Sequence, residues 1–333
     1  MRGPGRSRRF AILAVAAAAG ILMMTIAGPA SAATVLRVAT SGLPGSIHHV
    51  VGIKFVDAVN QALKGQVELQ LFHSSQLGTD EQVMKSIKLG VPEIVMTSSV
   101  MSSEDQRYGI FEMPYIIVNR AHMKRVSEDA QVKKALMDGL PAKGYRLLGF
   151  WENGFRHITN NTRPVVKPED LKGIKLRVPS GVWRVKMFKA YGANPTPLAY
   201  AETYSALQTG VIDGQENPLN ITYAGKFQEV QKFLSMTGHV YTPSYTIISE
   251  LVWQKLTKEQ QATIARIGWE MGDVSRATGE QMDNEMLSKL APPLKLNEAD
   301  KEAFIKASGA VYEDFGKEVR GGADLIKVIL SLR

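Results

Sequence analysis

Strand-like and helix-like segments alternate through the first hundred residues of this chain. The strand-like runs are 35–40, 66–72 and 93–97, and the segments with helical spacing of apolar residues between them are 47–63 and 79–90. The second helical segment opens with the capping-box sequence T-D-E-Q and ends at Gly90. Strands that alternate with helices form βαβ units, whose strands run parallel. We therefore expect an α/β fold with a largely parallel sheet.

The N-terminus has the composition of an export signal. An uncharged apolar stretch, 10–26, follows an arginine-rich start and precedes the sequence A-S-A at 30–32, which matches a signal-peptidase site. The stretch is short for a membrane anchor, and small residues follow it at once. We interpret residues 1–32 as a cleavable signal peptide and expect the mature protein in the periplasm. The Arg8-Arg9 pair leaves the general secretory route and the twin-arginine route both open.

The remaining residues, 33–333, are more than one hydrophobic core usually organises, so we expect two domains. Loss of the signal removes four arginines and no acidic residue, so the formal charge falls from +8 to +4. No dense basic block with interleaved aromatic residues remains, and we predict no nucleic-acid binding. The chain has 0 Cys, which excludes disulfides, iron–sulfur clusters and a cysteine nucleophile.

Common catalytic and nucleotide-binding motifs are missing from the sequence. It contains neither G-x-S-x-G nor H-E-x-x-H. It also lacks the phosphate-binding pattern G-x-x-x-x-G-K-S/T and the dinucleotide-binding pattern G-x-G-x-x-G. His48 and His49 are adjacent, so on a helix they point about 100° apart and do not easily bind one metal together. One of them can instead face a cleft, and we take His48 as a candidate binding residue. We predict no enzymatic activity, no metal site and no cofactor.

Arg177 lies in a segment with the period of a half-buried strand. Apolar residues alternate with basic residues over 174–178, and Pro179 then ends the strand because it has no amide hydrogen to donate. Strand ends are where open α/β sheets hold ligands, and a guanidinium group matches a carboxylate in a bidentate fashion. The alternative for Arg177 is that it is a solvated charge, or that it forms an ion pair with Glu169 or Asp170.

An ordered set of motifs surrounds this arginine. GFRHITN at 154–160 is followed by RPVVKPEDLKGIKLRVP at 163–179 and by GANPTPLAYAETYSALQTGVIDGQENPL at 192–219. This set resembles the signature region of the DctP-type solute-binding proteins, the extracytoplasmic receptors of tripartite ATP-independent periplasmic (TRAP) transporters. The similarity continues more weakly through QLGTDEQVMKSIKLG and KFQEVQKFLSMTGH, so it covers most of the mature chain.

The resemblance implies roles for particular residues. Arg177, in the K-L-R-V-P strand, would form the main salt bridge with a ligand carboxylate. Arg156 would add a second contact, and Asn217, in the G-Q-E-N-P loop, would hydrogen-bond the same carboxylate. Tyr200 would line the pocket beside them. The alternatives are a surface charge for Arg156, a loop-stabilising amide for Asn217 and core packing for Tyr200. Trp151 is a further cleft candidate that could instead pack at the hinge.

The resemblance also bears on the ligand. Sialic-acid receptors of the family present an acidic and a basic side chain after the third strand, where this sequence reads T-S-S-V-M at 97–101. Both charges are missing, which argues against sialic acid. Ser98, with Thr97 and Ser99, could hydrogen-bond hydroxyl or oxo groups instead. The expected ligand is a compact organic acid: a C4-dicarboxylate, a 2-oxo or hydroxy acid, or a sugar acid.

The resemblance implies a type II-like two-lobe periplasmic-binding-protein fold, with hinge strands and a long helix, 257–290, that spans both lobes. We expect residues 33–153 and about 243–282 in lobe I, and residues 154–242 and about 283–333 in lobe II. The implied partners are the small and large TRAP membrane subunits, which would take up the acid by ion-driven transport. A ligand-sensing module for a membrane signalling partner would use the same fold and is the alternative.

Overall fold

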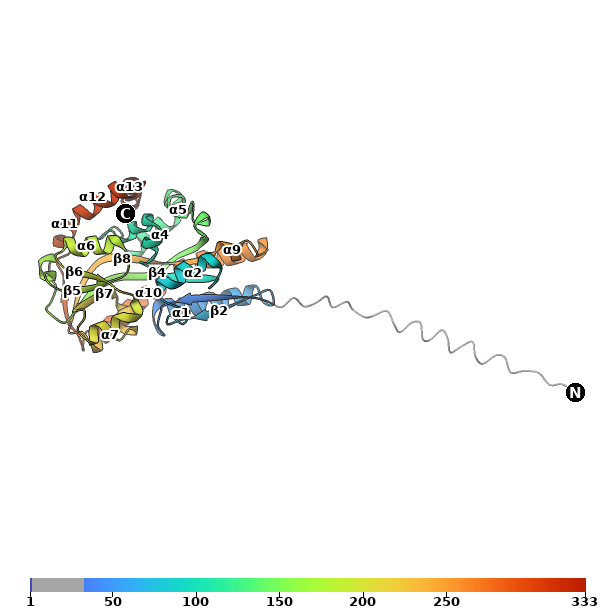
Figure 1. Cartoon of the computed structure of the whole chain (residues 1–333), viewed down its shortest axis with the longest axis horizontal. Coiled ribbons are helices and arrows are strands. Elements are labelled where there is room, and N and C mark those ends of the chain that lie inside the picture. The colour runs from blue at the N-terminus through green and yellow to red at the C-terminus, as the bar shows by residue number, and fades with distance from the viewer. Residues whose placement is uncertain (2–32) are drawn as a thin grey trace.

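The computed structural model describes residues 33–333, together with Met1. The predicted signal peptide lies outside the described residues apart from Met1. Within the described part, no helix is both long enough and apolar enough to cross a membrane. The strands of this part form one nine-stranded sheet in the order β2-β1-β3-β8-β4-β7-β5-β6, with β9 also paired to β8. Helices pack around the sheet, with α1 and β2 on one side of the molecule and β5, β6 and β7 on the other (Figure 1).

The first group of strands is built as the alternation predicts. β1 (Thr34–Thr40) pairs in parallel with β2 (Val67–Phe72) and with β3 (Ile94–Thr97), and α1 (Ile47–Ala62) connects the first two. The capping box at the start of α2 (Asp80–Ser86) is present, because the Thr79 hydroxyl accepts from the backbone of Gln82 and the Gln82 side chain accepts from the backbone of Thr79. The helix continues as a 3₁₀ turn and ends at Gly90, as expected.

Two long antiparallel strands run through the centre of the sheet. β4 (Tyr145–Asn160) pairs along its length with β8 (Phe233–Ser249). One end of β8 pairs with β3, and the other end pairs with β9 (Lys295–Glu298). The β4–β8 pairing is irregular beside Gly154, whose φ of 122° is a conformation that residues with a side chain rarely adopt. The sheet is therefore parallel only within its outer groups, because its centre consists of strands that carry the chain across and back.

The second group of strands lies along the other half of β4. β5 (Lys175–Val178) pairs in parallel with β6 (Asn194–Pro197) and with β7 (Gly214–Pro218), and β7 pairs antiparallel with β4. From the sequence we expect G-Q-E-N-P to be a loop that contains Asn217. This prediction is wrong, because Asn217 lies within β7. The polar sequence G-Q-E-N-P forms a strand because its side chains are buried against polar partners.

The long helix α10 (Lys258–Leu290) lies directly on β4. Gly268 makes this possible, because a Cβ atom there would lie 2.7 Å from the carbonyl oxygen of Leu148. Met282 belongs to the hydrophobic cluster that contains α1 and β2, whereas Met286 and Leu290 belong to a cluster with residues of α8 and β8. The helix therefore packs against α1, beside the first group of strands, and against α8, which follows β7 of the second group, as expected of a helix that spans both lobes.

The C-terminal helices contact α4 (Arg120–Glu128), which precedes β4, and α6 (Val182–Ala190), which follows β5. The backbone carbonyl of Ile329 in α13 (Gly322–Ser331) hydrogen-bonds His122 of α4, while Lys186 of α6 forms an ion pair with Asp314. The residue boundaries proposed for the lobes stay a prediction.

The remaining helices are α3 (Met101–Glu104), α5 (Ala130–Met137), α7 (Thr203–Gln208), α8 (Leu219–Ala224), α9 (Glu250–Trp253), α11 (Lys301–Lys306) and α12 (Gly309–Glu318). Short 3₁₀ turns are η1 (Ile87–Leu89), η2 (Gln106–Glu112), η3 (Pro141–Lys143), η4 (Pro168–Leu171), η5 (Tyr200–Glu202) and η6 (Phe227–Glu229).

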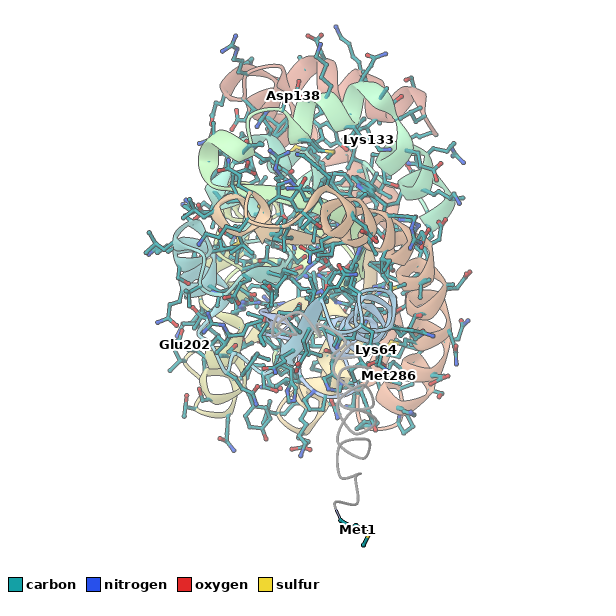
Figure 2. The ribbon with its side chains drawn as sticks, turned by 90° about the vertical axis from the view of Figure 1, so that its right-hand side faces the viewer. Met1, Lys64, Lys133, Asp138, Glu202 and Met286 are labelled. Atoms are coloured by element: carbon teal, nitrogen blue, oxygen red, sulfur yellow. The ribbon has the colours of Figure 1, made fainter. Side chains whose placement is uncertain are left out.

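Side chains fill the space between the sheet and the helices, and charged groups such as Lys64, Asp138 and Glu202 project from the surface (Figure 2). Glu202 is exposed, as a solvated charge would be.

Candidate functional site

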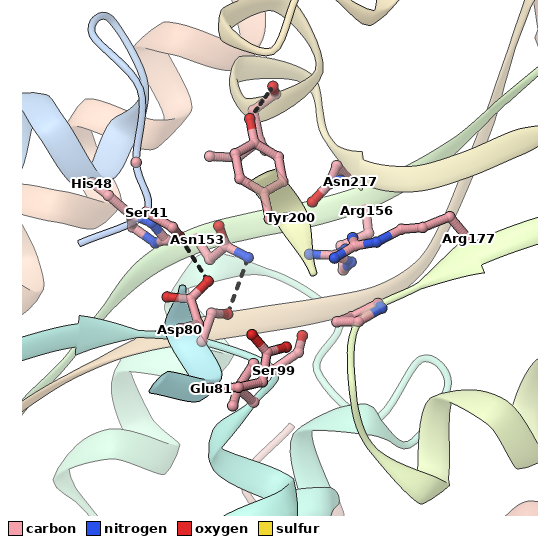
Figure 3. Close-up of a pocket in the computed structure, with 15 residues that line it drawn as sticks. Ser41, His48, Asp80, Glu81, Ser99, Asn153, Arg156, Arg177, Tyr200 and Asn217 are labelled. Atoms are coloured by element: carbon pink, nitrogen blue, oxygen red, sulfur yellow. Dashed lines mark hydrogen bonds between the residues drawn. The ribbon is translucent and has the colours of Figure 1, made fainter. Parts of the chain in front are cut away.

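A cavity of about 60 Å³ lies where the ends of β1, β3 and β5 meet β4 (Figure 3). Residues from both groups of strands line it, so a bound molecule would contact both sides of the hinge. Carboxyl ends of parallel strands are the usual ligand sites of α/β sheets. The lining residues are Ser41, Gly42, His48, Asp80, Glu81, Ser98, Ser99, Val100, Asn153, Arg156, Arg177, Pro179, Tyr200, Asn217 and Ile221.

Arg177 reaches this cavity from the end of β5 and is 3% exposed. Its Nε and Nη2 atoms donate to the carbonyl oxygen of Leu198, at 2.9 and 2.7 Å, which fixes the guanidinium plane. Within the part of the chain that the structure describes, Arg177 forms no ion pair, so the predicted alternative of pairing with Glu169 or Asp170 is wrong. Burial, followed by the charge of Arg156, lowers the pKa of Arg177 to about 10. The group is still charged at neutral pH.

Arg156 also lines the cavity, but a carboxylate already neutralises it. Its Nε and Nη2 atoms donate to the Glu216 carboxylate at 2.5 and 2.9 Å. Glu216 also accepts from Arg184 at 2.6 Å and lies 3.1 Å from the ring Nε2 of His239. Arg184 forms a second ion pair, with Glu112. Burial opposes ionisation of Glu216, but Arg156 and Arg184 outweigh it and lower its pKa.

Arg156, Arg184, Glu216 and Glu112 therefore form one buried network of ion pairs. Arg177 is outside it, and of the two arginines in the cavity lining it is the one without a carboxylate partner in the described structure. A buried charge that lacks a counter-ion is costly, so a carboxylate placed beside Arg177 would relieve that cost.

Asn217 and Tyr200 line the cavity near the two arginines (Figure 3). Asn217 donates one amide hydrogen to Gln215 at 2.5 Å and has a second to offer. Tyr200 turns its hydroxyl to the carbonyl oxygen of Ile221, at 3.3 Å, and its ring packs edge-on against Phe227. Tyr200 therefore presents its ring to the cavity, whereas Asn217 presents a polar group.

His48 and two serines bring polar atoms to the opposite side. His48 is 7% exposed, and its Nε2 has no hydrogen-bond partner within the described part of the chain. Burial, followed by the charge of Arg156, lowers the pKa of His48 to about 4, so its ring is neutral at pH 7. Ser98 donates to the Pro243 carbonyl and accepts from the amide of Asn153, whereas the buried hydroxyl of Ser99 has no partner.

Two acidic residues of the cavity, Asp80 and Glu81, were not predicted from the sequence as site residues. The capping-box pattern accounted for them as the first turn of a helix, which they are. Asp80 accepts a hydrogen bond of 2.7 Å from Ser41, and burial raises its pKa to about 6. Glu81 accepts from Ser180 at 2.8 Å, and its buried Oε2 has no partner. The signal that could have found them is topological, since α2 begins at the same sheet edge as the loops after β1 and β3.

Trp151 does not belong to this cavity, which corrects its prediction as a cleft residue. It is 1% exposed, its indole nitrogen donates to the carbonyl oxygen of Gly268 at 2.7 Å, and its ring packs edge-on against Phe55. The side chain fills the contact between β4, α1 and α10, which is the alternative of packing at the hinge. Among the residues described, no cluster of three or more histidine, aspartate and glutamate side chains could hold a metal ion.

Comparison with known proteins agrees with this architecture. Residues 43–318 match the model of the DctP family, described as "Bacterial extracellular solute-binding protein, family 7". The chain belongs to the DctP family. The 2,3-diketo-L-gulonate-binding periplasmic protein of Escherichia coli strain K12 is 33% identical over 285 residues, which cover 84% of this chain and 87% of that protein.

Solved structures of TRAP periplasmic solute-binding proteins are also similar. A TRAP periplasmic solute-binding protein of Sulfurospirillum deleyianum with bound succinate has a TM-score of 0.84 and 34% identity, and the match covers 91% of this chain and 100% of that one. A second, from Polaromonas sp. JS666 and bound to D-erythronate, has a TM-score of 0.85 and 31% identity over 90% and 98% of the two chains. These matches confirm the family inferred from the motifs and its two-lobe α/β fold.

Proposed function

We propose that this DctP protein captures a small organic acid in the cavity beside Arg177, with the carboxylate of the acid on the Arg177 guanidinium. The observation that carries the proposal is the state of Arg177, which is buried, held in place by Leu198 and without a carboxylate partner among the described residues. Of its five N–H donors, two hydrogen-bond Leu198, which leaves donors for a ligand. Hydrogen bonds of this charge-assisted kind contribute about 1.5–3 kcal/mol each.

The other predicted contacts follow from their positions around the same cavity. Asn217 has an amide hydrogen for the carboxylate, and Tyr200 supplies an apolar wall. Arg156 adds positive potential, although Glu216 holds two of its nitrogens. The lining comes from both sides of the hinge, so ligand contacts favour the closed arrangement of the lobes.

Delivery of the acid to TRAP membrane subunits in the periplasm completes the proposed role. Support comes from membership of a family whose relatives are named as periplasmic TRAP receptors. Release of an unchanged ligand is expected, since the role is capture and not conversion. Mass spectrometry of the acid recovered after incubation with the protein tests this point, and a chemically altered acid would contradict it.

A thermal-shift screen of residues 33–333 against organic acids tests the binding site. A ligand at 100 times its Kd adds about 2.7 kcal/mol to stability, which is a shift of several degrees. Arg177→Ala should abolish the shift. Arg177→Lys is the matched control for charge, because lysine keeps the charge but not the planar fork, and it should recover only part of the affinity. Binding of the same acid by Arg177→Ala with wild-type affinity would overturn the proposal.

A further inference from the structure

The cavity is chemically polarised. In Figure 3 the groups that can hold a carboxylate, Arg177 and Asn217, lie to one side, and Asp80 and His48 lie to the other, with Glu81 below them. The first side carries the uncompensated guanidinium of Arg177. The second side offers hydrogen-bond acceptors and a neutral imidazole, and no Lys or Arg side chain from this side appears among the lining residues.

Unpartnered polar atoms on the second side point to a ligand with hydroxyl groups. The Oε2 atom of Glu81, the Nε2 atom of His48 and the Oγ atom of Ser99 are all buried and without a hydrogen-bond partner in the described structure. Carboxylate oxygens only accept hydrogen bonds, whereas a serine hydroxyl both donates and accepts, and a neutral imidazole nitrogen does one or the other. A hydroxyl group can satisfy each of these atoms, because it too both donates and accepts.

A second carboxylate on the ligand would meet the wrong chemistry at this position. It would lie against Asp80 and Glu81, and it would find no free cation there to offset the repulsion. Asp80 has a pKa of about 6, raised by burial, so it is mostly ionised at pH 7. Arg177, which among the described lining residues is the arginine without a carboxylate partner, has already been assigned to the first carboxylate.

We infer that this receptor selects acids with one carboxylate and several hydroxyl groups, such as aldonic acids, and that Asp80 and Glu81 exclude dicarboxylates. This inference rests on the proposed function of the cavity. It chooses the polyhydroxy monocarboxylates from the three ligand classes that the sequence left open. It also assigns to Asp80 and Glu81 a specificity role in addition to their place at the start of α2.

Ligands matched in length separate the two parts of the inference. Erythronate, tartrate, succinate and butyrate share four carbons but differ in hydroxyl groups and in the number of carboxylates. Gluconate with glucarate, and galactonate with galactarate, make the same comparison at six carbons. Isothermal titration of wild-type residues 33–333 should show at least one aldonate bound at least tenfold more tightly than its matching dicarboxylate. Succinate and butyrate should bind less tightly than the matching hydroxylated dicarboxylates, because they have no hydroxyl group and leave the hydrogen-bond acceptors of the cavity unpaired.

The double variant Asp80→Asn/Glu81→Gln tests the assigned residues. Asparagine and glutamine keep an oxygen acceptor for Ser41 and Ser180, so the fold is retained, and thermal unfolding checks this. In this variant the ratio of the dicarboxylate Kd to the aldonate Kd should fall at least tenfold. Glu202→Gln, at an exposed site outside the cavity, should leave the preference unchanged. An unchanged preference in the double variant would overturn the role of Asp80 and Glu81.

The two proposals fail in different ways. Binding of succinate or glucarate as tightly as any aldonate, with loss of that binding in Arg177→Ala, would overturn the selection proposed here and leave the receptor function intact. Binding that Arg177→Ala does not change would overturn the proposed function, and this inference with it.

Discussion

The hydroxyl of Ser180 donates a hydrogen bond of 2.8 Å to the carboxylate of Glu81, 99 positions earlier in the chain. Glu81 lies in the first turn of α2, the helix that follows β2, and Ser180 follows β5, so the bond joins the two groups of strands across the cavity. A second bond of this kind runs from the backbone of Ile47 to the Asn220 side chain at 3.2 Å. In the structure in which the cavity is formed, these two hydrogen bonds therefore hold residues from the two sides of the hinge together.

Ser180→Ala should weaken ligand binding about tenfold, because a hydrogen bond to a charged group is lost and Glu81 keeps an unpaired oxygen. The loss should be mainly in a faster dissociation rate, since the bond holds the closed arrangement. Surface plasmon resonance measures the rate. Ser205→Ala removes an exposed hydroxyl that bonds a backbone carbonyl outside the cavity, and it serves as control. Equal dissociation rates for the two variants would contradict the expectation.

Glu216→Gln should lower the free energy of unfolding by about 3–5 kcal/mol, because it leaves Arg156 and Arg184 buried without their shared carboxylate. Urea denaturation measures the loss. Glu202→Gln is the matched control, since its carboxylate is exposed, and it should change stability by less than about 0.5 kcal/mol. A loss of similar size in both variants would show that the network contributes little.

Local pattern was enough to predict much of the fold. Alternation and capping residues placed the strands and helices of residues 34–97, and the motif set placed Arg177, Arg156, Asn217 and Tyr200 around one cavity. Prediction from local pattern failed for a strand whose buried side chains are polar and for a strand at the edge of the sheet. β7 has no apolar alternation because its Glu216 is satisfied by arginines from β4 and α6.

β6 shows the edge case. It contains Pro195 and Pro197, which would break a central strand, but β6 is the last strand of the sheet order and needs partners on one side only. Asp80 shows the third kind of failure. Its sequence context explains it fully as a helix start, and its approach to Arg177 depends on how two distant loops meet at the sheet edge.

Gly109→Ala should destabilise the protein by about 1–3 kcal/mol through overpacking. A Cβ atom at Gly109 of η2 would lie 2.2 Å from the indole of Trp183 in α6, and Trp183 is fully buried against Phe315. Gly309→Ala is the matched control, because a Cβ atom at the first residue of α12 would meet nothing within 4 Å. Alanine favours the helix there, so stability should be unchanged or slightly raised. Thermal unfolding compares the two, and equal midpoints would contradict the overpacking.

His157 should make the protein less stable in acid. Its ring Nδ1 accepts a hydrogen bond of 3.2 Å from the backbone of Gly238, and burial, followed by the positive charges of His239 and Lys301, lowers its pKa to about 3. In the unfolded chain a histidine titrates near pH 6.5. Between these values the unfolded state binds a proton that the folded state does not, so the stabilising contribution is complete above pH 6.5 and is lost as the pH falls towards 3.

His157→Asn removes this titration and keeps an acceptor for Gly238. Urea unfolding of both proteins from pH 7.5 to 4.5 should show the wild type losing about 1 kcal/mol more per pH unit than the variant below pH 6.5. Asp80 and His48 also have shifted pKa values, but they are present in both proteins, so the difference between the two curves isolates His157. If the free energies of unfolding of the two proteins fell in parallel with pH, His157 would be protonated to the same extent in the folded and unfolded states. That result would contradict the prediction.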